Sequence, residues 1–168
     1  MAIREIYKYP HPVLRKRAAE VKTFDDALRR LVDDMVETMY AEPGVGLAAP
    51  QIGVSQRVLV IDTTVGERPG ALIVLVNPVI VSTTGRVASE EGCLSVSGIR
   101  AEIPRAESVE ICGWTLDQQE MTLKGRGLLG RAFQHEVDHL DGMLIWERMG
   151  KVQREVLKSQ WKRLQREA

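Results

Sequence analysis

The sequence contains few of the residues that would indicate a disulfide scaffold or a strongly charged binding protein. It has two cysteines, three histidines and only 5% aromatic residues, and its 23 basic side chains balance 23 acidic ones. Two cysteines are too few for the disulfide framework of a small secreted domain. A formal net charge of zero produces no overall field that would attract nucleic acid or an anionic membrane. We therefore expect neither DNA nor a membrane among the partners of this chain.

Long apolar segments are also absent. No run approaches the roughly 18 apolar residues that a membrane-spanning helix needs. Residues 1–6 lack the apolar core of a signal peptide, and Glu5 and Glu20 are atypical of a transit peptide. The composition, with 44% hydrophobic and 27% charged residues, is that of an ordinary globular protein. No repeat or linker interrupts the chain, so we expect one domain over residues 1–168, located in the cytoplasm.

Helical spacing marks both ends of the chain. Thr23 is a favourable N-cap, and Asp25 and Asp26 suit the first turn of a helix that ends before Pro43-Gly44. Apolar residues recur along this helix and should face the core: Leu28, Leu31, Val32, Met35, Val36 and Met39. A second pattern predicts a closing helix over residues 151–166, with one apolar face made of Val152, Val156, Leu157, Trp161 and Leu164.

The middle of the chain is rich in predicted strands. Short apolar runs at 57–61 and 72–76 are typical of buried strands, and residues 109–114 alternate as a half-buried strand does. Asn77-Pro78 interrupts the second run, which resumes at 79–81 and should end in a turn at 82–85. Residues 143–146 predict one more short strand.

A His-Glu-x-x-His pattern lies inside a helical segment near residue 135. Positions four apart lie on one face of a helix, so His135 and His139 can direct two imidazoles at one metal ion. Glu136 projects from the adjacent side and can reach a water on that metal. This is the arrangement that metal-assisted hydrolysis needs, whereas the alternative is a polar helix with two incidental histidines. Two of the three histidines lie here, which favours the metal site.

A catalytic metal site usually has a third protein ligand. No histidine follows His139, Asp141 is too near to close the site, and Glu147 and Glu155 lie in a new element. Upstream, Cys93 follows Gly92 in a segment between strands. A Cys93 thiolate would complete a Cys-His-His set with one open position.

Residues 44–53 form a stretch dominated by small residues. A phosphate-binding loop is excluded because no Lys-Ser/Thr pair follows the glycines and no strand precedes them. Gln51 is the one side chain in this stretch that makes directed hydrogen bonds. The stretch alone leaves open whether Gln51 is a functional donor or a solvated turn residue.

Three motifs, taken together, resemble those of the peptide deformylase family. In order along the chain they are Gly44-x-Gly46-x-Ala48-Ala49-x-Gln51, then Glu91-Gly92-Cys93-Leu94-Ser95, then Gln134-His135-Glu136-x-Asp138-His139. Segments outside these motifs are also similar to that family: Pro12-Val13-Leu14-Arg15, Val76-Asn77-Pro78 and Asp141-Gly142-Met143-Leu144. The resemblance therefore extends over essentially the whole chain and is far more specific than the His-Glu-x-x-His pattern alone.

The resemblance implies an α+β fold in which antiparallel sheets pack around a central metal-binding helix, with a helix at each end. It implies that Cys93, His135 and His139 hold one metal ion per chain, most often Fe²⁺ in the cell, with Zn²⁺, Ni²⁺ or Co²⁺ as substitutes. The substrate would be a nascent peptide starting with N-formylmethionine, and formate would be released. Metal-bound water would attack the formyl carbonyl, with Glu136 as general base and then general acid.

The same resemblance assigns residues that would contact the substrate. The Gln51 side chain and the Leu94 backbone N–H would stabilise the developing oxyanion. An apolar pocket for the methionine side chain would be lined by Val45, Leu128 and part of the metal helix. The remaining predicted substrate-binding residues are Gly46, Glu91, Gly92 and Arg100, although a surface salt bridge is an equal alternative for Arg100. Arg131 stands where some family members carry an apolar residue, and its aliphatic stem is expected to cover this pocket.

Two other classes of function remain as alternatives. A zinc endopeptidase would need a histidine or glutamate ligand after His139, and a structural metal site would need four protein ligands. The absence of a later histidine and the motif around Cys93 argue against the endopeptidase. Only three ligands, with Glu136 beside them, argue against the structural site. The basic closing helix at 151–166 has two interpretations as well, a solvated face or a surface that docks on the ribosome. We expect the protein to be a monomer.

Overall fold

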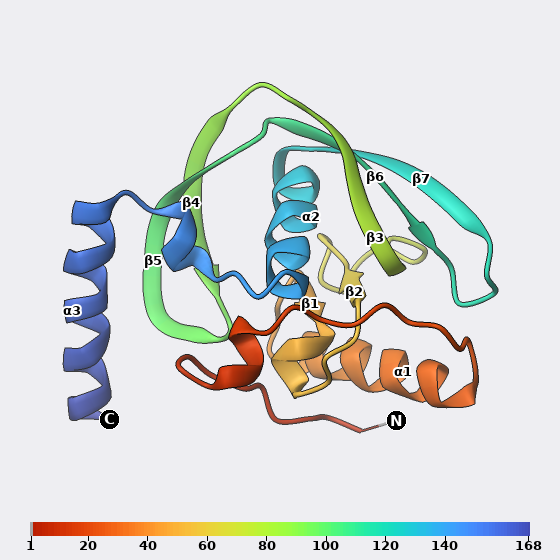
Figure 1. Cartoon of the computed structure of the whole chain (residues 1–168), viewed down its shortest axis with the longest axis horizontal. Helices are drawn as coiled ribbons and strands as arrows, with labels where there is room; N and C mark the ends of the chain where they lie inside the picture. Colours follow the sequence, from red (N-terminus) through yellow and green to blue (C-terminus); the bar gives the residue numbers. More distant parts are fainter. Residues whose placement is uncertain (1) are drawn as a thin grey trace.

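A computed structural model describes residues 2–168 and has the predicted α+β architecture (Figure 1). The helices are α1 (Asp26–Ala41), α2 (Gly127–Leu140) and α3 (Lys151–Glu167), and short 3-10 helices cover Pro12–Arg15, Ala49–Ile52 and Ile145–Arg148. The strands are β1 (Gly46–Ala48), β2 (Val58–Ile61), β3 (Ile73–Thr84), β4 (Val87–Cys93), β5 (Val96–Arg105), β6 (Ser108–Trp114) and β7 (Glu120–Arg126). The predicted α+β fold, with antiparallel sheets around the helix that carries His135 and His139, is thus confirmed.

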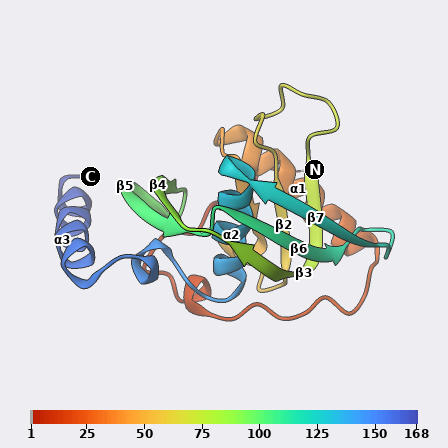
Figure 2. The ribbon, with the colours of Figure 1, turned by 90° about the horizontal axis from the view of Figure 1, so that it is seen from above.

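Two antiparallel sheets flank the central helix α2. One has five strands in the order β1-β2-β3-β6-β7, and the other is the β4-β5 hairpin. Seen from above, the β4-β5 hairpin and the long strands of the five-stranded sheet lie on either side of α2 (Figure 2). Helix α1 packs against the short strands β1 and β2. Strands β1 and β4 are both unpaired on one side, so two free strand edges border the region in front of α2.

Helix α1 forms where its apolar spacing predicts, but it begins later than expected. The predicted N-cap was Thr23, whereas the Asp25 side chain caps the helix by accepting a hydrogen bond from the Leu28 N–H at 3.0 Å. A carboxylate suits this position better because it also faces the positive end of the helix dipole. The predicted apolar stripe is buried in the core, with Val36 only partly so.

Strand β3 does not stop at the predicted turn. It continues through 82–84 to Thr84, where it pairs with Ser108 of β6. The Asn77-Pro78 interruption is a bulge in this strand rather than a break. Asn77 adopts a φ of 52°, and its side chain exchanges two hydrogen bonds with the Val21 backbone, at 2.8 and 3.0 Å. These bonds tie the bulge to the segment that precedes α1.

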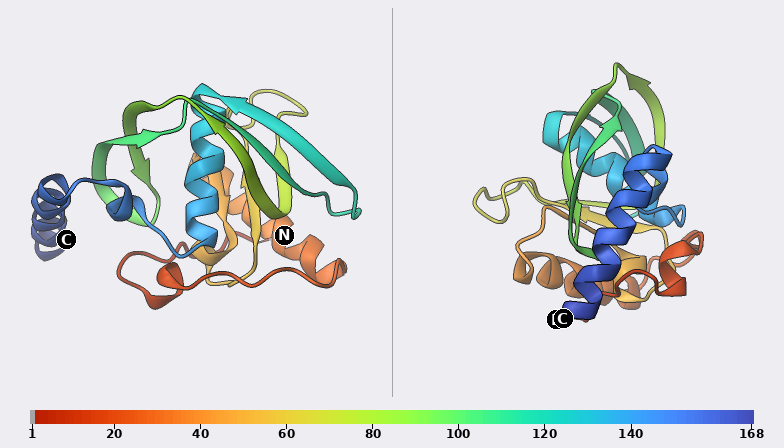
Figure 3. Two further views of the ribbon diagram at one scale, coloured as in Figure 1. Left: turned by 45° about the horizontal axis from the view of Figure 1, so that its top comes forward. Right: turned by 90° about the vertical axis from the view of Figure 1, so that its left-hand side faces the viewer.

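Near the C-terminus one prediction was wrong and another was only partly right. Residues 143–146 form no strand, because Trp146 turns fully into the core and a 3-10 helix runs from Ile145 to Arg148. Helix α3 forms as predicted and lies outside the β4-β5 hairpin (Figure 3). Its apolar face is divided, however, because Leu157, Trp161 and Leu164 pack on the core while Val152 and Val156 stay exposed.

Apolar clusters on several sides hold α2 in place. Phe133 and Leu140 are fully buried in the cluster that α2 shares with the five-stranded sheet. A second cluster joins α1 to β1 and β2, and a third joins β5 to Trp146 and α3. Within residues 2–168, no helix is long and apolar enough to cross a membrane.

Candidate active site

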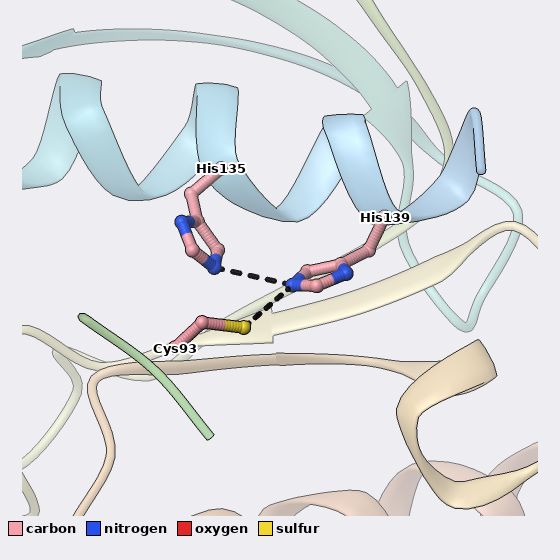
Figure 4. A group of neighbouring side chains, drawn as sticks. All are labelled: Cys93, His135 and His139. Atoms are coloured by element: carbon pink, nitrogen blue, oxygen red, sulfur yellow. Dashed lines mark hydrogen bonds between the residues drawn. The ribbon is translucent and has the colours of Figure 1, made fainter. Parts of the chain in front are cut away.

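Helix α2 and the β4-β5 hairpin bring three potential metal ligands together. His135 and His139 lie one turn apart on the face of α2 that points at the hairpin, and Cys93 reaches them from the end of β4 (Figure 4). Cys93 Sγ lies 3.4 Å from His139 Nε2, which lies 3.1 Å from His135 Nε2. Within residues 2–168 these three residues form the one cluster of such side chains, with all ligand atoms within 4.8 Å of one another.

The donor set fits a divalent metal. One thiolate and two imidazoles give three soft or borderline ligands and leave a fourth position for a reactant. Burial and the nearby charge of His135 hold the pKa of His139 well below its usual value, which keeps that imidazole neutral. For His135, burial lowers the pKa, but Glu136, Cys93 and Glu91 outweigh it and hold the pKa well above its usual value. His11, in contrast, lies on an exposed loop, where its Nδ1 accepts a hydrogen bond from the Val13 N–H at 3.1 Å.

Glu91 orients one of the histidines. Its Oε1 lies 2.9 Å from His135 Nδ1, which leaves His135 Nε2 directed at the cluster. Arg105 donates two hydrogen bonds to the Glu91 carboxylate, at 2.7 and 2.9 Å, and Arg131 donates another. Burial alone would raise the pKa of Glu91, but the hydrogen bonds from His135 and Arg105 hold it far below its usual value. The Glu91 carboxylate is thus engaged with these three residues, and its contact with the substrate stays a prediction.

The same arginine continues the network to the other side of α2. Arg105 Nη1 donates to Asp138 Oδ2 at 2.8 Å. Arg148 donates two further hydrogen bonds to the Asp138 carboxylate, at 2.9 and 2.6 Å. The Arg105 and Asp138 side chains are only 2% and 8% exposed, so this ion pair is shielded from water. Arg105 thereby ties the hairpin that carries Cys93 to the helix that carries both histidines.

Glu136 is buried beside the metal cluster. Its side chain meets Gly46, where any Cβ would lie 2.7 Å from Glu136 Oε2, so a larger residue at this strand position would displace the Glu136 carboxylate. The other carboxylate oxygen, Oε1, is buried and has no hydrogen-bond partner among the described residues. Burial raises the pKa of Glu136 to about 7, against the opposing charges of His135 and Arg105. A carboxyl group with this pKa exchanges protons readily near neutral pH.

Gln51 is a buried residue and not a solvated turn residue. Its Oε1 accepts a hydrogen bond from the Ala48 N–H at 3.0 Å, and its Nε2 donates to Ser95 Oγ at 3.2 Å. The first bond fixes which end of the amide carries the donors. Ser95 and Leu94 form the two-residue turn between Cys93 and Val96, so the Gln51 amide and the Leu94 backbone flank the cysteine.

A cleft of ≈ 700 Å³ opens in front of these groups. Its walls include every residue predicted to bind substrate, namely Val45, Gly46, Glu91, Gly92, Arg100 and Leu128, together with Cys93, His135 and Glu136. Arg131 also lines the cleft, but its guanidinium turns away to Glu91 and to the Ile103 and Val87 carbonyls. Arg100 forms the surface salt bridge that was its alternative, with Glu90 at 3.0 Å.

The chain is similar to known proteins over nearly its whole length. The model of the polypeptide deformylase family matches residues 3–155. This chain belongs to that family. It is 48% identical to a peptide deformylase of Acidobacterium capsulatum, over 99% of this chain and 98% of the relative.

Solved structures of peptide deformylases agree with this assignment. A crystal structure of a peptide deformylase from Legionella pneumophila superposes with a TM-score of 0.92 at 42% identity, covering 98% of this chain and 96% of the other. The enzyme from Thermus thermophilus gives 0.88 at 42% identity, covering 98% and 99%. The chain is thus a hydrolase of the peptide deformylase family, which removes the formyl group from the N-terminus of nascent peptides.

The residues that support the ligand side chains were not predicted from the sequence. Arg105, Asp138 and Arg148 were not among the predicted site residues, although they connect the elements that carry Cys93, His135 and His139. Asp138 had a usable signal, since it lies on the ligand helix three residues after His135. No local pattern marks Arg105 or Arg148, because their partners are distant in the sequence.

We predict that Glu91→Gln weakens metal binding, because the amide cannot orient His135 as a carboxylate does. Metal affinity should fall roughly 10–100-fold, as is typical when a partner of a metal-bound histidine is lost. Competition with a chelator under anaerobic conditions, followed by metal analysis, measures this change. Glu90→Gln is the matched control, because Glu90 is exposed and pairs only with Arg100. Equal metal retention by both variants would contradict the role given to Glu91.

Proposed function

We propose that this chain is a metal-dependent deformylase that hydrolyses the N-formyl group of N-terminal formylmethionine and releases formate. The convergence of Cys93, His135 and His139 beside the buried carboxyl of Glu136 is the observation that carries this proposal. The three aligned motifs supply the family context. We also propose that residues 1–168 act as one catalytic domain. The proposed ligands come from α2, which lies between the two sheets, and from the β4-β5 hairpin.

Cys93, His135 and His139 would hold one metal ion per chain. When bound, this ion supplies Lewis acidity that polarises the formyl carbonyl and lowers the pKa of water. We propose Fe²⁺ as the ion in the cell, by analogy with the family, and Zn²⁺, Ni²⁺ and Co²⁺ as ions that the same ligands accept. Imidazole and thiolate suit all of these metals, so the ligand set does not select among them.

Glu136 would transfer the protons of the reaction. Its free oxygen, Oε1, is buried beside the ligands and has no competing hydrogen bond within the described chain. As a carboxylate it accepts the proton of the attacking water, and as a carboxylic acid it returns that proton to the leaving amine. A pKa raised to about 7 by burial makes both protonation states accessible near neutral pH.

Gln51 and Leu94 would stabilise the oxyanion that develops on the formyl oxygen. The Gln51 amide is held by Ala48 and Ser95, so its donor end is fixed before substrate arrives. The Leu94 N–H lies at the tip of the hairpin, immediately after Cys93. Donors placed in advance lower the barrier because they need no reorganisation during the reaction.

The substrate peptide would bind between the two free strand edges. Gly46 of β1 and Gly92 of β4 border the cleft, and an extended peptide can add to such an edge by backbone hydrogen bonds. Val45, Leu128 and the Arg131 stem would contact the methionine side chain, and Arg100 would contact the chain beyond it. For Glu91 we propose the orientation of His135 in addition to the predicted substrate contact.

The substrate sets the proposed location and partners. Formylated nascent peptides arise at the ribosome, so we propose that the protein acts in the cytoplasm, as a monomer. Helix α3 exposes Lys151, Lys162 and Arg166 on its outer side, away from Leu157 and Trp161, which pack on the core. A basic face of this kind suits ribosomal RNA, and we propose that α3 docks there.

The acyl group distinguishes a deformylase from the endopeptidase alternative. We expect formyl-Met-Ala to be hydrolysed with a kcat/KM about 100-fold above that of acetyl-Met-Ala, because a tight site rejects one extra methyl group. Both rates are measured by quantifying the released Met-Ala by chromatography. Hydrolysis of the two peptides at similar rates would remove the deformylase assignment.

Replacing Glu136 with alanine should abolish turnover but not metal binding, because Glu136 is not among the three ligands. We expect kcat to fall about 10²–10⁴-fold, the usual contribution of a general acid–base group. Steady-state kinetics with metal analysis of the same sample tests this. Glu42→Ala is the control, since Glu42 is an exposed carboxylate at the rim of the same cleft. Retained turnover in E136A would refute the assigned role.

Charge reversal on α3 tests ribosome docking without exposing the core. The double variant Lys162→Glu and Arg166→Glu should lower affinity for ribosomes about 10-fold at physiological salt, with unchanged hydrolysis of formyl-Met-Ala. Cosedimentation with ribosomes measures this affinity. Arg68→Glu with Lys124→Glu is the control, because both side chains are exposed and lie outside α3. An equal loss of affinity in the two double variants would exclude a specific role for α3.

A further inference from the structure

The N-terminal segment Tyr7–Tyr9 contacts the backbone at or next to both proposed oxyanion donors, Gln51 and Leu94. The Tyr7 N–H donates to the Gln51 carbonyl at 2.7 Å, and the Tyr9 N–H donates to the Ser95 carbonyl at 2.8 Å. This segment belongs to the red part of the chain that leads from the N-terminus to the 3-10 helix Pro12–Arg15, at the lower left of Figure 1. Its backbone thereby joins the 3-10 helix that carries Gln51 to the hairpin turn that carries Leu94.

Lys8 lies between these two backbone contacts and adds a third. Its Nζ donates to the Leu94 carbonyl at 2.8 Å and to Ser97 Oγ at 2.9 Å. Lys8 also lines the active-site cleft. A charged donor on a backbone carbonyl is stronger than a neutral one, so Lys8 is well suited to hold this carbonyl in one orientation.

The hairpin turn needs such support because its own strands do not supply it. Leu94 and Ser95 lie between the paired residues Cys93 and Val96, and the pairing shifts register between Gly92 and Cys93. Among the described residues, the Leu94 N–H donates to no backbone carbonyl outside the hairpin. The peptide groups of the turn are thus free to reorient unless another part of the chain fixes them.

The supporting segment is itself anchored on both sides of Lys8. The Tyr7 ring packs over Gly53, where a Cβ would lie 2.8 Å from the ring and where φ is +84°. The Tyr9 ring makes edge contacts with Trp146 and Trp161, with centroids 5.5 and 4.9 Å apart. Lys8 therefore extends from a fixed backbone, which lets its ammonium group define the position of the Leu94 carbonyl.

We propose that Lys8 is a positioning residue for the reaction. Its hydrogen bonds to the Leu94 carbonyl and to Ser97 Oγ hold the Leu94–Ser95 peptide, and this restrains the Leu94 backbone whose N–H is proposed to stabilise the oxyanion. This proposal rests on the proposed deformylase function and on the role given there to the Leu94 N–H. Lys8 acts through the hairpin turn and not on the metal ligands. Its removal should therefore weaken transition-state stabilisation more than substrate binding.

The test compares Lys8→Met, Lys8→Arg and Lys16→Met with the wild-type protein at equal metal content. Methionine keeps an unbranched stem but removes both hydrogen bonds, whereas arginine retains donors for the same two oxygens. Lys16 is the control because it is exposed and its side chain makes no hydrogen bond among the described residues. We expect K8M to lower kcat for formyl-Met-Ala about 10-fold with KM changed less than about 3-fold, since a misplaced oxyanion donor costs less than a deleted one. K8R should recover most of this loss, and K16M should match wild type.

Amide hydrogen exchange followed by NMR gives a readout that does not depend on turnover. Exchange at the Tyr9 N–H, which donates to the Ser95 carbonyl of the turn, should be about 10-fold faster in K8M than in wild type or K16M, because the turn moves away more often. Unchanged kcat and unchanged exchange in K8M would overturn the proposal. A lower melting temperature with normal kcat would also overturn it, since Lys8 would then act on stability alone. If the wild-type protein itself fails to hydrolyse formyl-Met-Ala, the proposed function fails, whereas the exchange result still tests whether Lys8 holds the turn.

Discussion

The buried guanidinium of Arg105 is the contact on which the geometry of the site depends. It binds Glu91 on β4 and Asp138 on α2 at the same time, and both carboxylates are shielded from water. Removing one member of a buried ion pair costs about 3–5 kcal/mol, because the remaining charge has no partner. The three charges therefore fix the distance between the hairpin and the helix. That distance decides whether Cys93 meets His135 and His139.

The remaining site groups depend on this docking in different ways. Glu136 is buried because Gly46 of β1 lets the strand approach α2 closely, and burial is what raises its pKa. Gln51 reaches the same space from a 3-10 helix and bonds to Ser95 across the cleft. The site is thus assembled from β1, the 3-10 helix after it, the β4-β5 hairpin and α2. The N-terminal segment adds support through Tyr7, Lys8 and Tyr9.

Local sequence patterns predicted helices and strands well where the buried apolar residues follow the period of that element. The α1 stripe, the strands around 58–61 and 108–114 and the ligand helix all formed close to their expected places. Predictions failed where a long-range contact outweighed local propensity. Residues 82–84 continue β3 because β6 offers a partner, and Trp146 enters a 3-10 helix because the core between β5 and α3 has room for its ring. Val152 and Val156 were predicted to belong to the apolar face of α3. They stay exposed because only the side of α3 that carries Leu157, Trp161 and Leu164 packs on the core.

The sequence by itself determined the chemistry of the site. His135, Glu136 and His139 lie within one and a half helical turns, so helix geometry alone brings them together, and the motif around Cys93 identified the third ligand candidate. The tertiary structure decided which groups support them. Glu91 turned out to orient His135, Arg105 to join two elements, and Lys8 to hold Leu94 from a position 86 residues away. Such pairings leave no periodic signal, because they depend on how separate elements pack and not on the repeat of any one element.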